Sequence, residues 1–478
     1  MCDFKIWNVD YFCTWDTQAV FADKANAVMD EVAIAGQQGT ACSTRDAINE
    51  QAVFGDNGWI DYYPEVRKHL YFLIDDGWDV DYGVQMKEGD WEKFGSHNLN
   101  ETRFPSFKGS PEEKLKEFVR RVKEKGWKGL GIWIPAQQYG ADFRKGVTQT
   151  RDFWVEMLLR SKNAGVSYWK VDWGTWAYDA NIRRQFSELA REIYPELVIE
   201  HGICCWLIAD KDNYIGRFEN DASCARAVAL TQFSDVVRSY DVSPQLSMAT
   251  TLDRIYNVLP NSNAIINCED EHYMAASLGF AMGVMSMPET AGGLRAAAVT
   301  RWHQVAPAFV GGSCEFSQKV YLDWYDFEPG DTWARFLDGR RVYQGAPAIF
   351  ARNTTLPKVD CDGEPPFVAA SMNPNGAYSV ASLKRTLGKT TSSAPIVECE
   401  INAAPENIGL FGAFKKVTLN LTKAPRAIAL RNLITDETSN ITTEGELSSY
   451  LVICEEILDK YHKTCFGEEA AYHLKIVY

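Results

Sequence analysis

The chain has 478 residues, of which 46% are hydrophobic and 24% charged, and its formal net charge is -15. No apolar run approaches the roughly 20 residues that a membrane-spanning helix needs, and the negative charge, with no basic stretch to offset it, disfavours binding to nucleic acid or anionic lipid. Since the chain is too long for one ordinary core, a barrel of roughly 250 to 350 residues with a smaller second domain is the natural division.

Short apolar strands alternate with amphipathic helices over the first 310 residues or so, and loops rich in Asp, Trp and Gly follow the strands. This alternation predicts parallel βα units. We expect strands at Val9–Thr14, Leu70–Ile74, Gly129–Ile134, Val166–Val171, Leu197–Glu200, Asp235–Val237, Ala264–Asn267 and Val284–Met287. Eight such strands, of which the sixth is weak, favour a closed (β/α)8 TIM barrel over an open sheet.

Two of the intervening helices have clear end signals. Ser110 followed by Pro111 is a typical helix start, and Gly126 ends that helix before the third strand. Residues 150–164 repeat the arrangement, with Gly165 as the C-terminal stop. The sequence therefore predicts two consecutive βα units, each with a strand followed by a helix of clear bounds.

The pattern changes after about Gly312 to short alternating runs broken by Asn, Gly, Pro and Asp. These runs are Phe367–Met372, Ala377–Leu383, Lys416–Leu421, Ala427–Leu430 and Ser448–Val452, and Thr354–Pro366 has the composition of an exposed loop. We therefore predict a catalytic barrel over residues 1–312 and a C-terminal antiparallel β-sandwich domain over residues 313–478.

The cysteines and the N-terminal residues indicate in which cellular compartment the protein is expected. The 12 cysteines form no CxxC pair and no zinc spacing, so scattered reduced thiols are expected. Residues 1–10 lack the basic segment followed by an apolar one that marks a secretory signal. A cytoplasmic location is the expectation, unless a leader has been removed.

Candidate catalytic residues are sought at the carboxyl ends of the barrel strands, where TIM barrels place their active sites. Strand alternation puts Lys170 and Asp172 on one face, so the ammonium is expected to lie beside the carboxylate and lower its pKa. A carboxylate that stays ionised at neutral pH can act as a nucleophile. An ion pair that only holds strands together is the alternative, but a strand end between Trp169 and Trp173 favours catalysis.

Two further acidic groups follow strand ends. Asp75 and Asp76 suit bidentate hydrogen bonding to neighbouring hydroxyls of a sugar, with a cation site (Asp79 and Asp81 lie close behind) or helix capping as alternatives. The run 269–272, Glu-Asp-Glu-His, lacks the second histidine at helical spacing that would favour a metal site. Substrate contact or capping of the next helix is expected there instead.

Three motifs in barrel order resemble the α-galactosidase (melibiase) clan, glycoside hydrolase families 27 and 36. They are Asp75-Asp76-Gly77-Trp78, then Arg103-Phe104-Pro105 followed by Gly126–Trp133, and Tyr168-Trp169-Lys170-Val171-Asp172. The likeness covers about residues 10 to 310, and Ser277–Pro288 resembles the last helix and strand of that barrel. The large N-terminal β domain usual in family 36 has no counterpart, which favours the family 27 layout and leaves the choice of family open.

The resemblance implies roles for single residues. Asp172 would be the nucleophile that forms a covalent glycosyl-enzyme, while Asp75 and Asp76 would hold the axial O4 and the O6 that distinguish galactose from glucose. The residues implied to contact the sugar are Trp15, Asp75, Asp76, Trp133, Lys170, Cys205, Arg238 and Asp270.

The acid/base of the clan is an Asp shortly after an Arg beyond strand six, which here indicates Arg238 and Asp241. The family pattern usually has one more residue between the two, so Asp235 stays a competitor. A retaining enzyme needs this carboxyl roughly 5 to 5.5 Å from the nucleophile, protonated at rest by a raised pKa. Relatives select the group at sugar C2 on strand five, where the small Cys205 is typical of those that accept N-acetylgalactosamine.

The sequence therefore predicts a retaining exo-α-glycosidase that hydrolyses terminal α-linked galactose-type sugars of oligosaccharides or glycoconjugates by double displacement, without cofactor or metal. α-N-acetylgalactosaminidase and β-L-arabinopyranosidase activities are alternatives on the same scaffold. Two other classes stay open: a non-catalytic carbohydrate-binding protein, and a metal-dependent barrel lyase or isomerase with Lys170 as base and ligands Asp75, Asp76, Glu269 and Asp270. Neither nucleic acid nor a membrane is an expected partner, and a homo-oligomer is conceivable.

Overall fold

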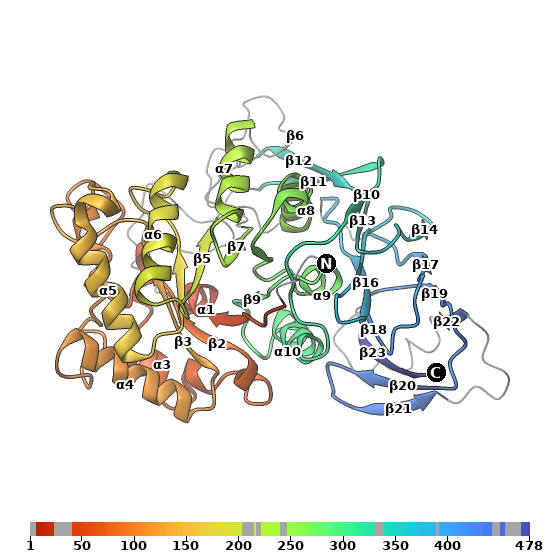
Figure 1. Cartoon of the computed structure of the whole chain (residues 1–478), viewed down its shortest axis with the longest axis horizontal. Helices are drawn as coiled ribbons and strands as arrows, with labels where there is room; N and C mark the ends of the chain where they lie inside the picture. The colour runs from red at the N-terminus through yellow and green to blue at the C-terminus, as the bar shows by residue number, and fades with distance from the viewer. Residues whose placement is uncertain are drawn as a thin grey trace.

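A barrel wrapped by helices and a stack of β-sheets lie at opposite ends of the molecule (Figure 1). The computed structural model describes residues 6–22, 41–202, 215–216, 221–239, 246–328, 339–388, 392–441, 450–454 and 470–478. The barrel comes from the N-terminal part of the chain and the stacked sheets from the C-terminal part, as the colour gradient shows.

The barrel consists of parallel strands in the closed order β8-β7-β5-β4-β3-β2-β1-β9. A parallel bridge between Asn267 and Ala281 joins the two ends of this order. The strands are β1 (Tyr11–Cys13), β2 (Tyr71–Ile74), β3 (Gly129–Ile134), β4 (Tyr168–Val171), β5 (Val198–Gly202), β7 (Val236–Arg238), β8 (Ile265–Asn267) and β9 (Gly283–Val284). The predicted (β/α)8 barrel is confirmed, and each predicted strand overlaps one of these.

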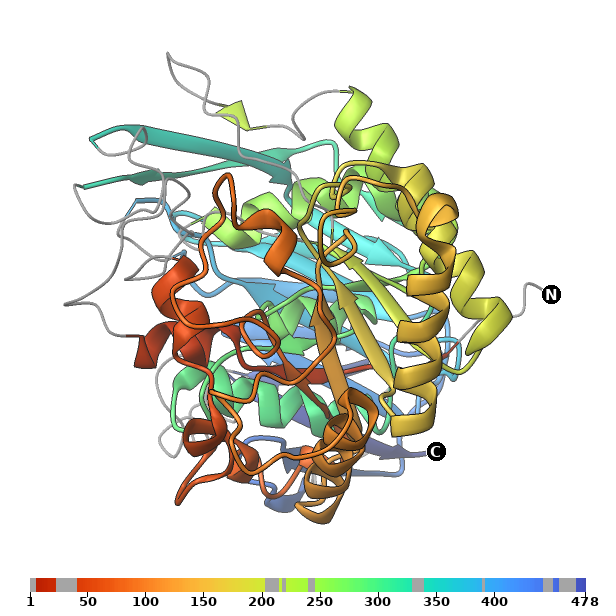
Figure 2. The same ribbon diagram turned by 90° about the vertical axis from the view of Figure 1, so that its left-hand side faces the viewer.

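Helices cover the outside of the barrel, and Figure 2 shows two of the longer ones, α5 and α6, along one flank of the strands. The α-helices are α1 (Trp15–Phe21), α2 (Ala41–Asp46), α3 (Glu50–Phe54), α4 (Pro111–Glu124), α5 (Arg151–Ala164), α6 (Ala180–Ile193), α7 (Asp221–Thr231), α8 (Ser247–Val258), α9 (His272–Leu278) and α10 (Ala291–His303). Short 3-10 turns are η1 (Trp59–Asp61), η2 (Arg67–His69), η3 (Trp91–Lys93), η4 (Val147–Thr150) and η6 (Leu259–Asn261).

The predicted ends of α4 and α5 are confirmed. Ser110 Oγ accepts from the Glu113 amide while the Glu113 carboxylate accepts from the Ser110 amide, which satisfies two free amides of the first turn. Helix α5 ends at Gly165, which adopts a left-handed φ of 84° that a residue with a Cβ would disfavour.

The C-terminal part is a sandwich of two sheets around one core. One sheet holds β10 (Cys314–Phe316), β13 (Ile349–Arg352), β15 (Phe367–Met372), β16 (Tyr378–Leu383), β18 (Asn407–Gly412), β23 (Ala470–Val477), β20 (Ala427–Asn432) and β21 (Thr438–Ile441), and the other β14 (Lys358–Asp360), β17 (Ile396–Glu400), β19 (Lys416–Asn420) and β22 (Tyr450–Cys454). The pairs β13–β15, β16–β18 and β17–β19 are parallel, whereas the others are antiparallel. The alternating sequence pattern does not distinguish these directions, because side chains alternate in both. Strand β14 also lies inside the segment 354–366 that was expected to be a loop.

A hairpin reaches back from this part toward the barrel. It consists of β11 (Val320–Asp326) and β12 (Arg341–Pro347), and β12 pairs with β6 (Ile215–Gly216), which belongs to the connection between β5 and β7. Figure 1 shows this three-stranded sheet beside α7 and α8. The two parts of the chain are therefore joined by strand pairing as well as by packing.

Helix α9 is enclosed between the barrel and the larger sheet. All seven of its residues are buried, and Ser379 Oγ of β16 donates to its Ser277 carbonyl at 3.2 Å. The main core cluster runs without interruption from barrel residues such as Ile266 to sheet residues such as Phe350 and Phe411. On this side of the barrel, α9 thus packs against the larger sheet, whereas an outer helix of such a barrel is usually exposed to solvent on one face.

Arg352 of β13 fixes this junction. Its guanidinium donates to the carbonyls of Leu278 (2.8 Å), Gly279 (3.2 Å), Phe309 (2.8 Å) and Gly311 (2.8 Å) and lies over the Phe309 ring. Burial lowers the pKa of this guanidinium to about 9. The carbonyls at the end of α9 carry partial negative charge, which favours a cation there.

The described cysteines, Cys13, Cys42, Cys224, Cys268, Cys314, Cys361 and Cys399, are free thiols. Among the described residues, no helix combines the length and apolar character needed to cross a bilayer.

Candidate active site

Asp172 lies directly after β4, at the carboxyl end of the barrel. Its Oδ1 is 2.6 Å from Arg238 Nη2, and its Oδ2 accepts from Trp133 Nε1 at 3.1 Å. Burial alone would raise the pKa of the Asp172 carboxyl, but the charges of Arg238 and Lys170 and the Trp133 hydrogen bond together lower it below the ordinary value. The carboxylate is therefore ionised at neutral pH and held in one orientation, with 14% of its side chain exposed.

The backbone around Asp172 is held from α6. Arg183 donates to the carbonyls of Asp172 and of Val171 (3.1 Å), which fixes the end of β4. Gly202, at the end of β5, allows the approach of Arg238: a Cβ there would lie 2.6 Å from Arg238 Nη2 and 3.2 Å from Asp172 Oδ1. A larger residue at position 202 would displace the ion pair.

The expected direct pairing of Lys170 with Asp172 is wrong, because Arg238 takes that place. Lys170 Nζ instead lies 3.0 Å from Asp75 Oδ2 and 2.8 Å from Glu269 Oε1. Residues two apart on a strand share a face but are separated by roughly 6.5 Å along it. The ammonium therefore reaches sideways to the ends of β2 and β8, and its charge acts on Asp172 at longer range.

Asp75 and Asp76 are buried at the end of β2 and engage different partners. Asp75 Oδ2 accepts from the Cys13 thiol at 3.0 Å as well as from Lys170. Asp76 receives two parallel hydrogen bonds from Arg45, at 2.9 Å each. Burial raises the pKa of Asp76, and the Arg45 charge opposes that shift. Both carboxylates thus have fixed oxygen positions, as a specific hydrogen-bonding site requires.

The cation-loop alternative for this region is not supported by the geometry. Asp79 Oδ2 accepts from the His97 amide at 3.1 Å, and Asp81 Oδ1 accepts from Asn100 Nδ2 at 2.9 Å. These two carboxylates belong to the packing of the following loop.

Glu269 takes the position that sequence reasoning gave to Asp270. Its Oε1 accepts from Lys170 Nζ and from the Tyr11 hydroxyl at 2.9 Å, and its Oε2 lies 3.3 Å from Arg238 Nη1. Asp270 Oδ1 accepts instead from the Met285 amide at 3.0 Å, away from the two cations. Glu269 stands two positions after the inward-facing Asn267, so strand alternation could have identified it.

A buried layer beneath these groups was missed by the sequence analysis. Glu200 of β5 accepts from Tyr11 (3.1 Å), Tyr168 (2.9 Å) and Asn267 (2.7 Å). Burial raises the pKa of Glu200. The Tyr11 hydroxyl also lies 2.9 Å from Glu269 Oε1 and shares its single proton between the two carboxylates, so this layer fixes the position of Glu269 above it.

The expected metal ligands of a lyase or isomerase already have protein partners. Asp75 and Glu269 flank the Lys170 ammonium, and Asp76 is paired with Arg45. Burial alone would lower the pKa of Lys170, but Asp75, Cys13 and Glu269 raise it well above its ordinary value. Lys170 is therefore protonated, which contradicts its proposed role as a base.

The remaining predicted residues are Trp15, Asp235, Asp241 and Cys205. Trp15 is the first residue of α1 and packs half-buried on the barrel core, whereas Asp241 and Cys205 lie outside the described residues. Asp235 precedes β7, at the opposite end of the strand from Arg238. Its carboxylate pairs with Arg191 and accepts from the Ile199 amide at 3.0 Å, so it does not face Asp172.

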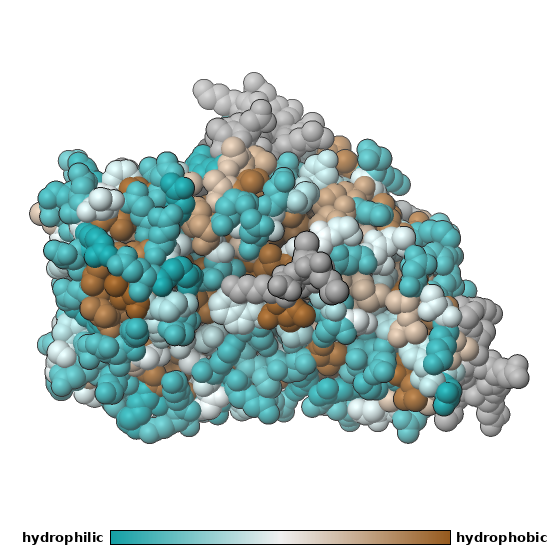
Figure 3. Space-filling model, viewed as in Figure 1, coloured by the Kyte–Doolittle hydropathy of each residue, from teal (hydrophilic) through white to brown (hydrophobic). Residues whose placement is uncertain are grey.

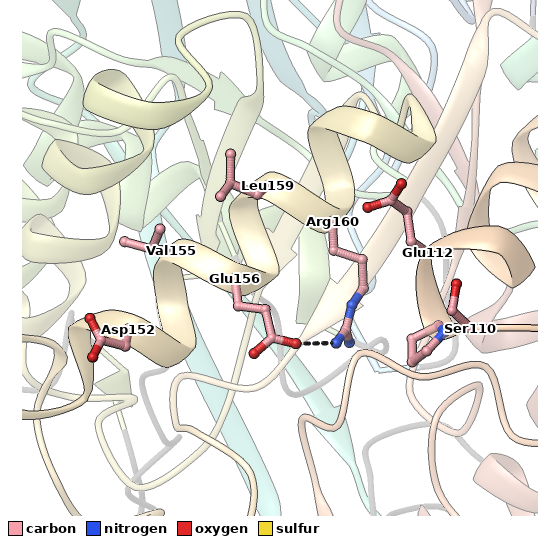
Figure 4. Close-up of a pocket in the computed structure, with 8 residues that line it drawn as sticks. Ser110, Glu112, Asp152, Val155, Glu156, Leu159 and Arg160 are labelled. Carbon is pink, nitrogen blue, oxygen red and sulfur yellow. Dashed lines mark hydrogen bonds and ion pairs between the residues drawn. The ribbon is translucent and has the colours of Figure 1, made fainter.

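A hollow on the outer surface lies between α4 and α5, away from these strand ends. It is lined by Ser110, Pro111, Glu112, Asp152, Val155, Glu156, Leu159 and Arg160. Figure 4 shows Arg160 turned toward Glu156, with which it forms an ion pair at 2.6 Å. In Figure 3 this side of the barrel shows hydrophobic residues, in brown, among hydrophilic residues, in teal.

No family model and no curated protein sequence matches the chain. Solved structures to which it is similar include a GH27 β-L-arabinopyranosidase from Geobacillus stearothermophilus, with 12% identity, a TM-score of 0.43 and coverage of 98% of this chain and 96% of that one. An α-galactosidase from Saccharomyces cerevisiae shares 11% identity over 98% of this chain and 97% of that one, with a TM-score of 0.43.

Proposed function

We propose that the protein is a retaining exo-α-glycosidase that acts on terminal α-linked galactose-type sugars, with Asp172 as nucleophile. The observation that carries the proposal is the ionised Asp172 carboxylate, half-buried at the barrel mouth with both oxygens oriented by Arg238 and Trp133. Attack at an anomeric carbon needs a fixed, ionised carboxylate, which this site provides.

The reaction takes two steps. Asp172 forms a bond to C1 while the bond from C1 to the leaving oxygen breaks, and Asp241 gives that oxygen a proton. A water molecule then attacks C1, passes its proton to Asp241 and releases the sugar from Asp172. The assignment of Asp241 rests on the sequence pattern after Arg238, and the position of Asp235 at the opposite end of β7 favours it over that competitor.

The groups around Lys170 suit a ring with several hydroxyls. The ammonium is a donor flanked by the acceptors of Asp75 and Glu269, and such alternation matches neighbouring hydroxyls, which both donate and accept. The preference for galactose-type sugars follows from the resemblance of the Asp75-Asp76 and Lys170-Asp172 motifs to the melibiase clan. The group at C2, where Cys205 is implied to act, separates galactose, N-acetylgalactosamine and arabinopyranose as substrates.

The test compares turnover of para-nitrophenyl α-galactoside, α-N-acetylgalactosaminide and β-L-arabinopyranoside by wild type, Asp172→Ala, Asp241→Ala and Asp235→Ala. Asp172→Ala should abolish turnover of whichever glycoside is cleaved. Asp241→Ala should lose most activity, and less of it on substrates with good leaving groups. Full activity of Asp172→Ala contradicts the proposal, and a loss in Asp235→Ala that matches the one expected of Asp241→Ala overturns the acid/base assignment.

Two controls address the other classes. Activity should be unchanged in EDTA, whereas a metal-dependent lyase or isomerase would lose it. A protein that only binds carbohydrate would bind the free sugar in calorimetry and cleave none of the three glycosides.

A further inference from the structure

The hydroxyl of Tyr11 lies between two carboxyls and has one proton to offer. Its oxygen is 3.1 Å from Glu200 Oε1 and 2.9 Å from Glu269 Oε1. Burial and the charges of the two carboxyls raise the pKa of Tyr11 well above its ordinary value, so the phenol keeps its proton. If both carboxyls were ionised, one of the two contacts would set oxygen lone pairs against each other. Two contacts of hydrogen-bond length therefore need a second proton, which a carboxyl has to supply.

The surroundings of Glu269 favour its ionised form. Its Oε1 lies 2.8 Å from Lys170 Nζ, and its Oε2 lies 3.3 Å from Arg238 Nη1. Two cations at such distances stabilise a negative charge on the carboxylate between them. The second proton therefore does not belong to Glu269.

The surroundings of Glu200 favour its protonated form. Its side chain is fully buried, and within the described part of the chain its hydrogen-bond partners are the neutral groups of Tyr11, Tyr168 and Asn267. Tyr168 and Asn267 both donate to Oε2, at 2.9 and 2.7 Å. The Asn267 amide is oriented for this, because its Oδ1 accepts from the Gly283 amide at 2.8 Å. Oε1, which faces Tyr11, is thus the oxygen that can carry the proton.

The charge balance of the site agrees with this assignment. Two cations contact three carboxylates there: Lys170 contacts Asp75 and Glu269, and Arg238 contacts Asp172 and Glu269. A fourth negative charge, on Glu200, would be buried without a cation at contact distance, which is costly. Burial raises the pKa of Glu200 and Glu269 adds to the shift, while Arg238 and Lys170 oppose it from a greater distance.

We infer that Glu200 is protonated in the resting protein and donates a hydrogen bond to Tyr11, whose own proton then points to Glu269. The donors of this chain all point toward the candidate sugar site, where Glu269 accepts from Tyr11, Lys170 and Arg238. Glu200 is thus a positioning residue that acts on Glu269 through Tyr11. This role, though not the protonation itself, rests on the proposed function.

The protonation state is tested without substrate. Infrared difference spectra of the whole protein in D2O at pH 7, wild type minus Glu200→Gln, should contain the carbonyl band of a protonated carboxylic acid. A spectrum with carboxylate bands and no acid band would overturn the inference. The matched control is Asp79→Asn at pH 5, because the Asp79 pKa of about 7 leaves that buried acid protonated there.

The positioning role is tested by separating KM from kcat. Tyr11→Phe removes the donor to Glu269, and Glu200→Ala removes the donor to Tyr11. Each should raise KM about tenfold for the glycoside that the wild type cleaves, roughly the effect of one hydrogen bond to a charged group. The kcat should change little, because Glu269 and Lys170 contact hydroxyls that are held alike in the ground state and the transition state. Glu200→Gln can still donate to Tyr11 and accept from Tyr168, so it should restore most of the affinity.

The outcomes separate this inference from the proposed function. If Tyr11→Phe lowers kcat and leaves KM unchanged, the layer only supports the fold and the positioning role is overturned. If Glu200→Gln raises KM as much as Tyr11→Phe, Glu200 acts as an anion and the inference fails. If the wild type cleaves no glycoside, the proposed function fails, while the infrared spectra still decide the protonation of Glu200. Tyr11→Phe and Glu200→Gln carry the test if Glu200→Ala does not fold.

Discussion

The buried carboxyl of Asp79, in the loop after β2, predicts how the free energy of unfolding changes with pH. Its carboxyl is fully buried, and burial raises its pKa from 3.8 to about 7, with the charge of Asp76 adding to the effect. Hydrogen bonds from Ser96 and the His97 amide oppose the shift, and the His97 ring is neutral because burial lowers its pKa to about 3. Among the residues that the structure describes, no cation lies beside Asp79 to offset its loss of hydration when it is ionised.

The magnitude follows from the two pKa values. An acid whose pKa is higher in the folded than in the unfolded state binds its proton more tightly when folded, so it destabilises the fold as pH rises between the two values. At about 1.4 kcal/mol for each pH unit, Asp79 destabilises the protein by roughly 4 kcal/mol above pH 7 and by less than half of that at pH 5. Asp79→Asn removes this titration and keeps an oxygen for the His97 amide.

The assay is the free energy of unfolding in urea at pH 5 and pH 8 for wild type and Asp79→Asn. Raising the pH between these values should lower the stability of wild type relative to Asp79→Asn by about 2 to 3 kcal/mol. Asp81→Asn, in the same loop, controls for the loss of one negative charge. A difference between wild type and Asp79→Asn that is the same at both pH values would refute the reasoning.

Three further predictions concern the cations and their partners. Arg238→Met should move the acid limb of the kcat/KM profile to higher pH, because Arg238 is the main group that lowers the pKa of Asp172 against burial; an unmoved limb in pH–rate measurements contradicts this. Glu269→Gln should reduce kcat/KM far more than Asp270→Asn in the same turnover assay, since only Glu269 contacts Lys170 and Arg238; equal losses would place Asp270 at the sugar. Arg352→Met should destabilise the protein by roughly 2 to 5 kcal/mol in urea unfolding, because buried carbonyls lose their donor; an unchanged midpoint would show that water replaces it.

The barrel could be predicted from the sequence because its strands are short, mostly apolar runs and its helices carry local end signals such as Ser110 and Gly165. Alternation along β4 also placed Lys170 and Asp172 on one face, which the structure confirms. Alternation located five of the C-terminal strands, β15, β16, β19, β20 and β22, but missed others such as β18 and β23. It also did not give the strand directions, since parallel and antiparallel pairs share the same side-chain period.

The partners of the site residues could not be predicted in the same way. Arg238 and Asp172 stand 66 positions apart, and Lys170 and Glu269 stand 99 apart, so these contacts depend on how far each strand is shifted around the barrel. The sequence analysis chose Asp270 over Glu269, although alternation from the inward-facing Asn267 at the end of β8 favours Glu269. Arg45 and Glu200 belong to no motif that was recognised, and only their burial and hydrogen bonds in the structure reveal their roles.

Because α9 is enclosed, the stability of the C-terminal sheet affects the position of the site residue Glu269. Glu269 stands three residues before this helix, and the helix is held on its far side by β16 and by Arg352. A substitution that loosens the C-terminal sheet therefore reaches the Lys170 and Arg238 cations through α9, without touching the barrel strands. Variants selected for altered activity are expected to include residues of this sheet, and transplanting the barrel loops alone onto another scaffold would leave Glu269 without the support that sets its position.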